Sequence, residues 1–348
     1  MASERRINPL NGSMVIIAPE RAHRPSAFIK ARSSLSPENC QFCPGHENET
    51  TSEILAYRRN GSVRDDSEWW IRFIPNKFPA VVYERNDVIS HPLFQSHDAM
   101  GIHELGITRE HGADFGEPGF DDNHDLTYEL LWAMHERKNG RKDNTNPLPS
   151  IREQYPELVF AKFFKNRGEE AGGSLDHPHI QLLAIDVIPQ KNKLEFSTTF
   201  EYSLKTGRCL LCDVLAEELK IGDRIVDKNS NYIAIEPYAS RFPYETWIVP
   251  ISHEKGFSLT HIKARSLADI VRKTFARLNV LLNNPDYNFY IRDSPLNSNG
   301  ASDQTYHWYI ELSPRLTKKG GWEYDTDMHI NPLAPEKAAD ELRAVKVD

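Results

Sequence analysis

Two stretches of the chain have the apolar spacing of amphipathic helices. In residues 125–137, and again in 263–282, apolar side chains recur three and four positions apart, as on one face of an α-helix. Each stretch is followed by a segment rich in aromatic and aliphatic residues, 158–166 and 287–295, which is typical of a buried β-strand. The pattern therefore predicts a helix followed by a strand twice. In the second helix the core-facing residues are Leu267, Ile270, Val271, Phe275, Leu278 and Leu282.

These two units belong to an internal repeat. Each half of the chain has a Cys-x-x-Cys pair, an apolar strand that ends in histidine, the helix, the strand, and a second histidine that opens another strand. This order predicts two related α+β halves. We place them at residues 1–190 and 191–348, with the connection around residues 190–208.

The chain has only four cysteines, all of them in these two pairs, and each pair predicts a metal site. Two intervening residues let a turn present both sulfurs to one ion, and the repeat-matched histidines complete a tetrahedral zinc site. The two predicted sites are Cys40, Cys43, His111 and His177, and Cys209, Cys212, His253 and His307. Four protein ligands close the coordination shell, so both zinc ions are interpreted as structural. A redox-active pair and unligated thiols stay as alternatives.

The two halves differ at a position suited to catalysis. His179 stands two residues after His177 on a predicted strand, so both side chains share one face, whereas the second half has Tyr309 at the matching place. We interpret His179 as the candidate catalytic residue. A further metal ligand and an ordinary strand residue are the alternatives.

The residues around His179 predict phosphate chemistry. Gly172 and Gly173 permit close approach of backbone N–H groups to an anion, and Ser174 adds a hydroxyl donor, although such stretches are usually only turns. An imidazole next to a phosphate can attack phosphorus and hold the group as a phosphoramidate. Gln181, the next residue on the same side, can donate a hydrogen bond but cannot act as an acid or base. The pattern favours a transferase over a hydrolase.

Composition excludes several classes of function. The 348 residues include 42 Lys and Arg against 50 Asp and Glu, and a net charge of −8 argues against a nucleic-acid partner. No run approaches the roughly 18 apolar residues of a membrane span, and the first residues show no signal core, so we expect a cytoplasmic protein without a membrane partner. An acidic protein that binds phosphates must gather its positive charge locally.

Several motifs together resemble the galactose-1-phosphate uridylyltransferase family of the histidine-triad superfamily. They are HPHIQ (177–181) after NRGEEAGGS (166–174), CQFC (40–43), NPLNGSMVIIAPERAHRP (8–25), RFIPNKFPAV (72–81), and HWYIELSPRL (307–316) with GGWE (320–323). The resemblance extends from about Arg6 to Arg343. It implies two tandem histidine-triad-like domains, each an antiparallel sheet with flanking helices. It also implies a double displacement in which His179 takes the nucleotidyl group of a nucleoside diphosphate hexose.

The resemblance also implies roles for single residues. Catalytic positions match His179, Gln181 and Ser174. Substrate contacts match Arg21, Arg24, Asn76, Asn166, Gly173 and Glu323, although a surface arginine or a turn asparagine is the ordinary alternative. The small-molecule partners would be a sugar nucleotide and a sugar 1-phosphate or inorganic phosphate. Members of the family are commonly dimers, which leaves a homodimer open.

The chain departs from the family pattern where some members bind iron. Those members use a Glu and three His, two of them in a segment of the type HWQLHAH, whereas this chain has Glu311 and Ser313 in their place. We therefore expect no iron, although Glu195 lies near the position of the family's Glu. The second Cys pair instead resembles that of ADP-glucose phosphorylase, which has a second zinc.

Four functions remain. The leading interpretation is uridylyl transfer between UDP-glucose and a hexose 1-phosphate such as galactose 1-phosphate. ADP-glucose phosphorylase activity, in which adenylyl passes to inorganic phosphate, is the close alternative. A dinucleoside polyphosphate hydrolase or phosphorylase would share the nucleophile. A zinc-stabilised nucleotide-binding protein without turnover is the alternative of another class, and the joint presence of His179, Gln181 and Ser174 argues against it.

Overall fold

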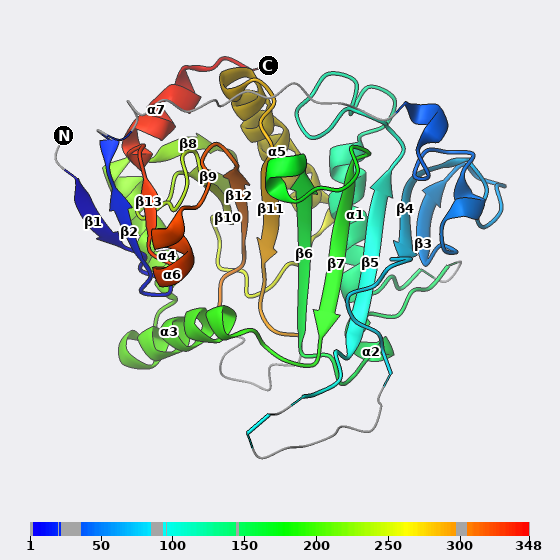
Figure 1. Ribbon diagram of the computed structural model, residues 1–348, viewed down its shortest axis with the longest axis horizontal. Helices are drawn as coiled ribbons and strands as arrows, with labels where there is room; N and C mark the ends of the chain where they lie inside the picture. The colour runs from blue at the N-terminus through cyan, green and yellow to red at the C-terminus, as the bar shows by residue number, and fades with distance from the viewer. Residues whose placement is uncertain are drawn as a thin grey trace.

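The computed structural model describes residues 3–19, 21, 36–84, 93–94, 96–143, 146–296 and 305–347, and its centre is one ten-stranded antiparallel sheet (Figure 1). Across the sheet, the first half contributes β3 (Leu55–Arg58), β4 (Trp69–Pro75), β5 (Gly101–Thr108), β7 (His179–Ile185) and β6 (Phe160–Arg167). The second half continues with β11 (Tyr287–Arg292), β12 (Tyr309–Pro314), β10 (Thr246–Pro250), β9 (Tyr232–Ile235) and β8 (Ile225–Lys228).

The two halves of the sheet have one topology. Read from the outer edges inward, β3, β4, β5, β7 and β6 correspond to β8, β9, β10, β12 and β11. The equivalent strands β6 and β11 pair antiparallel at the centre, with Phe164 opposite Tyr290 and Asn166 opposite Asn288. Antiparallel pairing of equivalent strands relates the halves by an approximate two-fold axis. The expected pair of antiparallel α+β units is confirmed, with the addition that their sheets are continuous.

Helices α1 (Leu126–Asn139) and α5 (His261–Leu282) cover one face of the sheet, as the apolar spacing predicts. The Asp125 carboxylate accepts from Tyr128 N at the start of α1, and the Thr260 hydroxyl accepts from Lys263 N at the start of α5. The core-facing side chains of α5 are buried against both α1 and the sheet. A last helix, α7 (Pro335–Ala344), packs beside α5.

The opposite face is covered at its two ends. Over the second half, α4 (Leu210–Ile221) packs Leu211 and Leu215 on the sheet, beside α3 (Gln190–Thr206). A small sheet of β1 (Glu4–Ile7), β2 (Met14–Ile17) and β13 (His329–Asn331), together with α6 (Gly321–Thr326), lies in front of the same half (Figure 1). Over the first half lies the loop that carries Cys40 and Cys43. Between these covers, Phe164 and Tyr290 are only half-buried, so the middle of this face is accessible.

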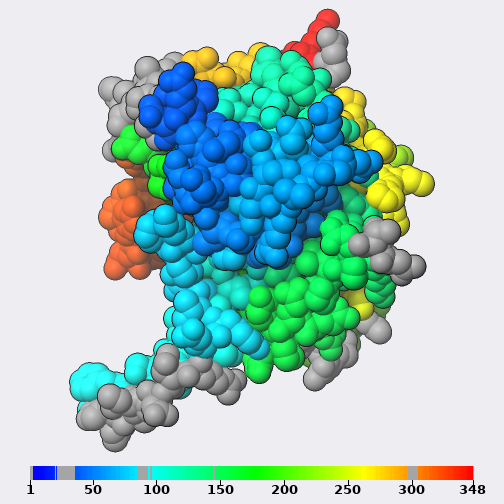
Figure 2. All heavy atoms as spheres, turned by 90° about the vertical axis from the view of Figure 1, so that its right-hand side faces the viewer, coloured from blue at the N-terminus to red at the C-terminus, as the bar shows by residue number. Residues whose placement is uncertain are grey.

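Two further features complete the fold. The short helix α2 (Ile151–Gln154) begins with a capping box in which Ser150 and Glu153 exchange hydrogen bonds. The chain near Leu93 and Phe94 stands out from the body of the molecule, and Phe94 is 74% exposed (Figure 2). Within the described residues, no helix has the length and apolar character needed to cross a membrane. The division of the chain at residue 190 coincides with the start of α3 and stays a prediction.

Candidate functional site

The structure brings together all four residues of the first predicted metal site. His177 lies two residues before the start of β7, and its Nε2–H donates to Thr108 O at 2.6 Å, which leaves Nδ1 without a hydrogen. That Nδ1 lies 3.5 Å from both Cys40 Sγ and Cys43 Sγ and 3.2 Å from His111 Nδ1. Ligands around tetrahedral zinc are separated by about 3.4–3.8 Å, given the usual Zn–N and Zn–S bond lengths. The group therefore fits a tetrahedral metal ion.

The electrostatics of this group also suit a cation. Burial and the neighbouring Cys40 sulfur raise the pKa of the Cys43 thiol to about 12, and burial lowers the pKa of His177 to about 3. A bound cation reverses the cost of ionising such thiols, because its charge stabilises the thiolates. A neutral His177 already has the form that a metal binds.

The second predicted group is assembled in the same way. Cys209 is the N-cap of α4 and Cys212 lies in its first turn, so the start of this helix presents both sulfurs. Cys212 Sγ is 3.5 Å from His253 Nδ1 and 3.4 Å from His307 Nδ1, and all four ligand atoms lie within 4.8 Å of one another. A hydrogen bond from the Cys212 thiol lowers the pKa of Cys209 to about 4. Within the described residues, these are the two clusters of His, Cys, Asp or Glu able to hold a metal.

Both strands that lead to a ligand end earlier than the sequence pattern predicts. β5 stops at Thr108 and β10 at Pro250, so His111 and His253 lie in the loops that follow. In the first half the reason is visible at Thr108, whose carbonyl accepts from His177 instead of continuing the ladder. The ligands are therefore brought together by loops anchored to strand ends.

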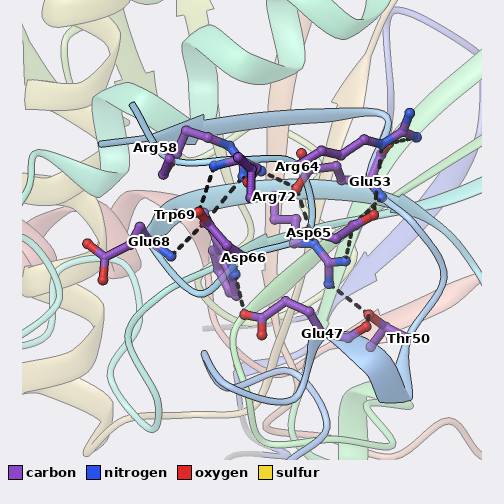
Figure 3. Close-up of polar contacts among 12 residues, drawn as sticks. Glu47, Thr50, Glu53, Arg58, Arg64, Asp65, Asp66, Glu68, Trp69 and Arg72 are labelled. Carbon is purple, nitrogen blue, oxygen red and sulfur yellow. Dashed lines mark hydrogen bonds and ion pairs between the residues drawn. The ribbon is translucent and has the colours of Figure 1, made fainter. Parts of the chain in front are cut away.

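A buried polar cluster fastens the Cys40–Cys43 loop to the sheet (Figure 3). Trp69 and Arg72 project from β4 toward the loop. The Trp69 indole donates to Glu47 Oε1 at 2.7 Å, and Arg72, which is 2% exposed, donates to Thr50 Oγ1 and Asp65 Oδ1, both at 2.7 Å. Charge-assisted bonds of this kind, which start from the buried side chains of Trp69 and Arg72, hold the loop in one position.

His179 is the first residue of β7 and is 7% exposed. Its Nδ1–H donates to the backbone carbonyl of His177 at 2.8 Å, and a carbonyl can only accept, so the lone pair of the ring is on Nε2. Burial lowers the pKa of His179 to about 4, which keeps the ring neutral. Phe42, from the Cys40–Cys43 loop, packs edge-on against it with ring centroids 5.5 Å apart. The structure thus presents a neutral imidazole with a defined tautomer.

Two residues that the sequence analysis missed support this strand. Lys165 on β6 donates to the His179 carbonyl at 3.5 Å and forms an ion pair with Asp114 at 3.1 Å. Both Lys165 and Asp114 are buried. His103 on β5 lies with Nε2 3.0 Å from Gln181 Oε1. Ala80 N–H donates to His103 Nδ1 at 3.2 Å, so the ring hydrogen is on Nε2 and is donated to Gln181. The alternation of His103 with Leu105 and Ile107 along β5 is a signal that could have placed it on this face.

The glycine-rich stretch forms a tight loop between β6 and β7. Gly168 and Gly172 have positive φ, and a Cβ on Gly168 would overlap the Asp286 carboxylate. Gly173 N donates to Gly168 O at 2.8 Å, and a Cβ there would lie 3.0 Å from Asn166 O. Gly168 is therefore required by its positive φ and by the Asp286 side chain, and Gly173 by its close contacts with backbone atoms. Ser174 follows on the exposed side of the loop.

Of the remaining residues predicted to contact the substrate, some lie near His179 and others do not. Asn166 is on β6, where its side-chain oxygen accepts from Asn288 Nδ2 at 2.8 Å. Asn76 follows β4, and its Nδ2 lies 3.3 Å from His103 Nε2 and 3.5 Å from His103 Nδ1. Glu323 instead accepts from Gly320 N at the start of α6, which lies over the second half of the sheet, away from β7 (Figure 1). Arg21 is exposed, and Arg24 lies outside the described residues.

The residues at the family's iron position form other contacts. Glu195 accepts from the Tyr306 hydroxyl at 2.7 Å, and Glu311 forms ion pairs with Arg241 and Arg292. Ser313 donates to Glu311 at 3.5 Å. The absence of iron stays a prediction.

Comparison with known proteins finds a matching family model and similar full-length sequences. Residues 195–321 match the model described as the C-terminal domain of galactose-1-phosphate uridyl transferase. The chain is 28% identical to an ADP-glucose phosphorylase of Arabidopsis thaliana, over 99% of this chain and 93% of that protein. It is 26% identical to a galactose-1-phosphate uridylyltransferase of Haemophilus influenzae, over 98% and 94%.

A solved structure agrees with these relatives. A crystal structure of an ADP-glucose phosphorylase from Arabidopsis thaliana with bound ADP-glucose superposes with a TM-score of 0.79 at 27% identity. The match covers 99% of this chain and 100% of that one, so the similarity includes both halves of the sheet.

Proposed function

Because the chain belongs to the galactose-1-phosphate uridylyltransferase family, with its ADP-glucose phosphorylase-like members, we propose that it transfers a nucleotidyl group from a nucleoside diphosphate hexose through His179. One observation carries the assignment of His179. Its Nδ1–H is bonded to the His177 carbonyl, so the Nε2 lone pair of a neutral ring is available for attack.

The proposed reaction has two displacements. In the first, Nε2 attacks the α-phosphorus, an N–P bond forms, and the P–O bond to the hexose 1-phosphate breaks. The leaving group departs as an anion, so it needs no proton. In the second, a phosphate oxygen of the acceptor attacks the same phosphorus, and the N–P bond electrons return to Nε2. Ser174 and the Gln181 amide donate to the phosphoryl oxygens, and neither is a base that would activate water.

Two substrate pairs are compatible with this chemistry. The first is uridylyl transfer between UDP-glucose and a hexose 1-phosphate, favoured by the Haemophilus relative, which is named a galactose-1-phosphate uridylyltransferase. Adenylyl transfer from ADP-glucose to phosphate is the second candidate, favoured by the higher identity to the Arabidopsis protein. In either case we propose that the substrate contacts Arg21, Arg24, Asn76, Asn166 and Gly173. A contact with Glu323, which lies away from β7 in this chain, stays a prediction.

We also propose that both Cys2His2 groups bind zinc. Two thiolates and two imidazoles close enough to surround one ion tetrahedrally are a ligand set typical of zinc. Four protein ligands leave no coordination position for substrate. The first ion would join the Cys40–Cys43 loop to His177 and so hold His179 in place. The second would hold α4 to the strand that begins at Tyr309. Residues 1–190 then form the catalytic domain and residues 191–348 its structural partner.

Intact-mass measurement after incubation with a sugar nucleotide tests the proposal. A uridylyl adduct formed from UDP-glucose, or an adenylyl adduct from ADP-glucose, is expected, and adding the acceptor should remove it. The two adducts differ in mass, so the measurement also identifies the preferred base. Saturable nucleotide binding without any adduct would instead support a binding protein without turnover.

His179→Asn and His261→Asn form a matched pair for assigning the nucleophile. His261 is an exposed residue at the start of α5, on the other face of the sheet. The adduct should disappear in the first variant and persist in the second. An adduct of full yield in His179→Asn would refute the assignment.

A further inference from the structure

A cavity of about 270 Å³ lies in the second half of the molecule. Its base includes side chains of β6, β11 and β12, and α3 and β13 contribute to its walls. In Figure 1, α3, α6 and β13 lie on the side of the molecule formed by the second half of the chain. Six of the residues that line it are cations, namely Lys162, Lys191, Arg241, Arg292, Arg315 and Lys319.

This cavity is the counterpart of the His179 site under the approximate two-fold relation. Tyr309 opens β12 as His179 opens β7, so Glu311 takes the place of Gln181. The strand register supports this equivalence. Gln181 is opposite Phe164 in the first half, and Glu311 is opposite Tyr290 in the second. Phe164 and Tyr290 are themselves opposite each other where β6 pairs with β11.

The second half lacks the nucleophile at this place. Tyr309 stands where the first half has its histidine, and its hydroxyl donates to Glu195 Oε1 at 3.3 Å. Glu311 is held by Arg292 at 2.7 Å and by Arg241. The second half therefore has a cavity at the equivalent place beside the sheet, but it lacks a histidine that could attack phosphorus.

The cations of the cavity outnumber the carboxylates that face them. Arg241 pairs with Glu245 and Glu311, and Arg292 pairs with Glu311 and, at 3.9 Å, with Glu195. Lys162, Lys191, Arg315 and Lys319 remain without a carboxylate partner in the ion pairs of the described residues. An excess of one sign of charge in a pocket concentrates counter-ions of the other sign.

Lys162 is the clearest sign of a missing ligand. Its ammonium group is buried and has no hydrogen-bond partner within the described part of the chain, and it lies 5.1 Å from the centroid of the Phe160 ring. Burial lowers the pKa of Lys162 to about 7, with Arg292 adding to the effect. An unpaired buried ammonium is costly, and an anion in the cavity would remove that cost.

We propose that this cavity binds the phosphate group of a small metabolite without turning it over. Lysine and arginine around a phosphate form charge-assisted hydrogen bonds. The volume falls just below the about 300–1,000 Å³ of most small-molecule pockets, so it suits inorganic phosphate or a phosphorylated sugar rather than a complete sugar nucleotide. The proposal rests on the cavity and its charges and is independent of the reaction at His179.

Isothermal titration of the zinc-loaded full chain with inorganic phosphate, and separately with glucose 1-phosphate, tests this site. The variants are Lys162→Met, which removes the buried charge at similar length, and Lys191→Gln at the rim. Lys193→Gln is the matched control, because Lys193 is also exposed in the first turn of α3 but does not line the cavity.

We expect saturable binding that weakens about tenfold in Lys162→Met, less in Lys191→Gln, and not in Lys193→Gln. Tighter binding of the sugar phosphate, lost in the same variants, would identify it as the ligand, and equal affinities would identify phosphate. Melting temperatures show whether each variant is folded, and Lys191→Gln gives the answer if Lys162→Met is not. Absence of saturable binding, or equal affinity in all proteins, would overturn the proposal.

Discussion

His103 decides which end of the Gln181 amide is available to a ligand. Because its Nδ1 accepts from Ala80 N–H, its Nε2–H must be donated to Gln181 Oε1, at 3.0 Å. The amide oxygen is thereby occupied, and the NH₂ group remains for a phosphoryl oxygen. The orientation of Gln181 is thus set from the neighbouring strand.

Replacing His103 should therefore slow nucleotidyl transfer. In His103→Phe the Gln181 amide can rotate, and we expect kcat to fall about tenfold or more with a smaller change in KM, since one donor to a developing charge is worth about 10²–10³ in rate. Steady-state kinetics measure both constants. His103→Gln, which can donate from its amide, should recover part of kcat, whereas equal loss in both variants would indicate a packing role only.

Removing one cysteine from each Cys2His2 group should separate the two metal sites. Cys43→Ser is expected to lose the first zinc, lower the melting temperature, and reduce adduct formation, because His177 and His179 are no longer fixed. Cys212→Ser should lose the second zinc and stability but retain adduct formation. Metal analysis and intact mass measure these effects. Full zinc occupancy in either variant would contradict the ligand assignment.

Acid should destabilise the contact between α1 and the start of α5 through His135. Its Nδ1 accepts from Leu259 N–H at 3.2 Å, and burial lowers the pKa of His135 from 6.5 to about 4. The unfolded chain therefore binds the proton more readily. The contribution of His135 is complete above pH 6.5 and is lost as the pH falls toward 4, by about 1–3 kcal/mol for a half-buried group.

His135→Gln tests this pH dependence, because a glutamine oxygen can still accept from Leu259 but does not titrate. Denaturant unfolding of both proteins near neutral pH and at about pH 5 gives the difference in free energy. The wild type should lose more stability than the variant on acidification. Parallel losses would assign the effect to other groups.

The buried ion pair between Arg137 and Glu104 joins α1 to β5. Two hydrogen bonds of 2.6 and 2.7 Å connect them, and the side chains are 0% and 3% exposed. Arg137→Met should lower the free energy of unfolding by about 3–5 kcal/mol, because it leaves Glu104 charged and unpaired in the core. The double variant with Glu104→Leu should recover most of this loss. A double variant as unstable as the single one would mean that packing of Arg137 dominates.

Much of this architecture can be read from local patterns. The helices α1 and α5 differ from the predicted ranges by no more than two residues, because a spacing of three and four is a property of each segment alone. The two metal groups were predictable since the repeat gave each Cys pair its histidines at matching places. His179 was singled out by comparison of the halves.

The features that could not be predicted from the sequence depend on contacts between segments that are distant along the chain. Nothing local to β6 or β11 indicates that they pair with each other and join two sheets. The contact between His103 and Gln181 could not be predicted from the sequence, because it depends on the register in which β5 pairs with β7. The cations of the basic cavity come from positions between 162 and 319 and gather only in the folded chain.

The antiparallel pairing of β6 with β11 also bears on how such a chain could arise and whether it can be divided. Since the strands are equivalent, a single half would carry an edge able to pair with its own copy in the same manner. The full chain is in this sense a tethered dimer, whose two members became free to differ once they were linked. Either half produced alone is expected to expose an unpaired central strand and to self-associate through it.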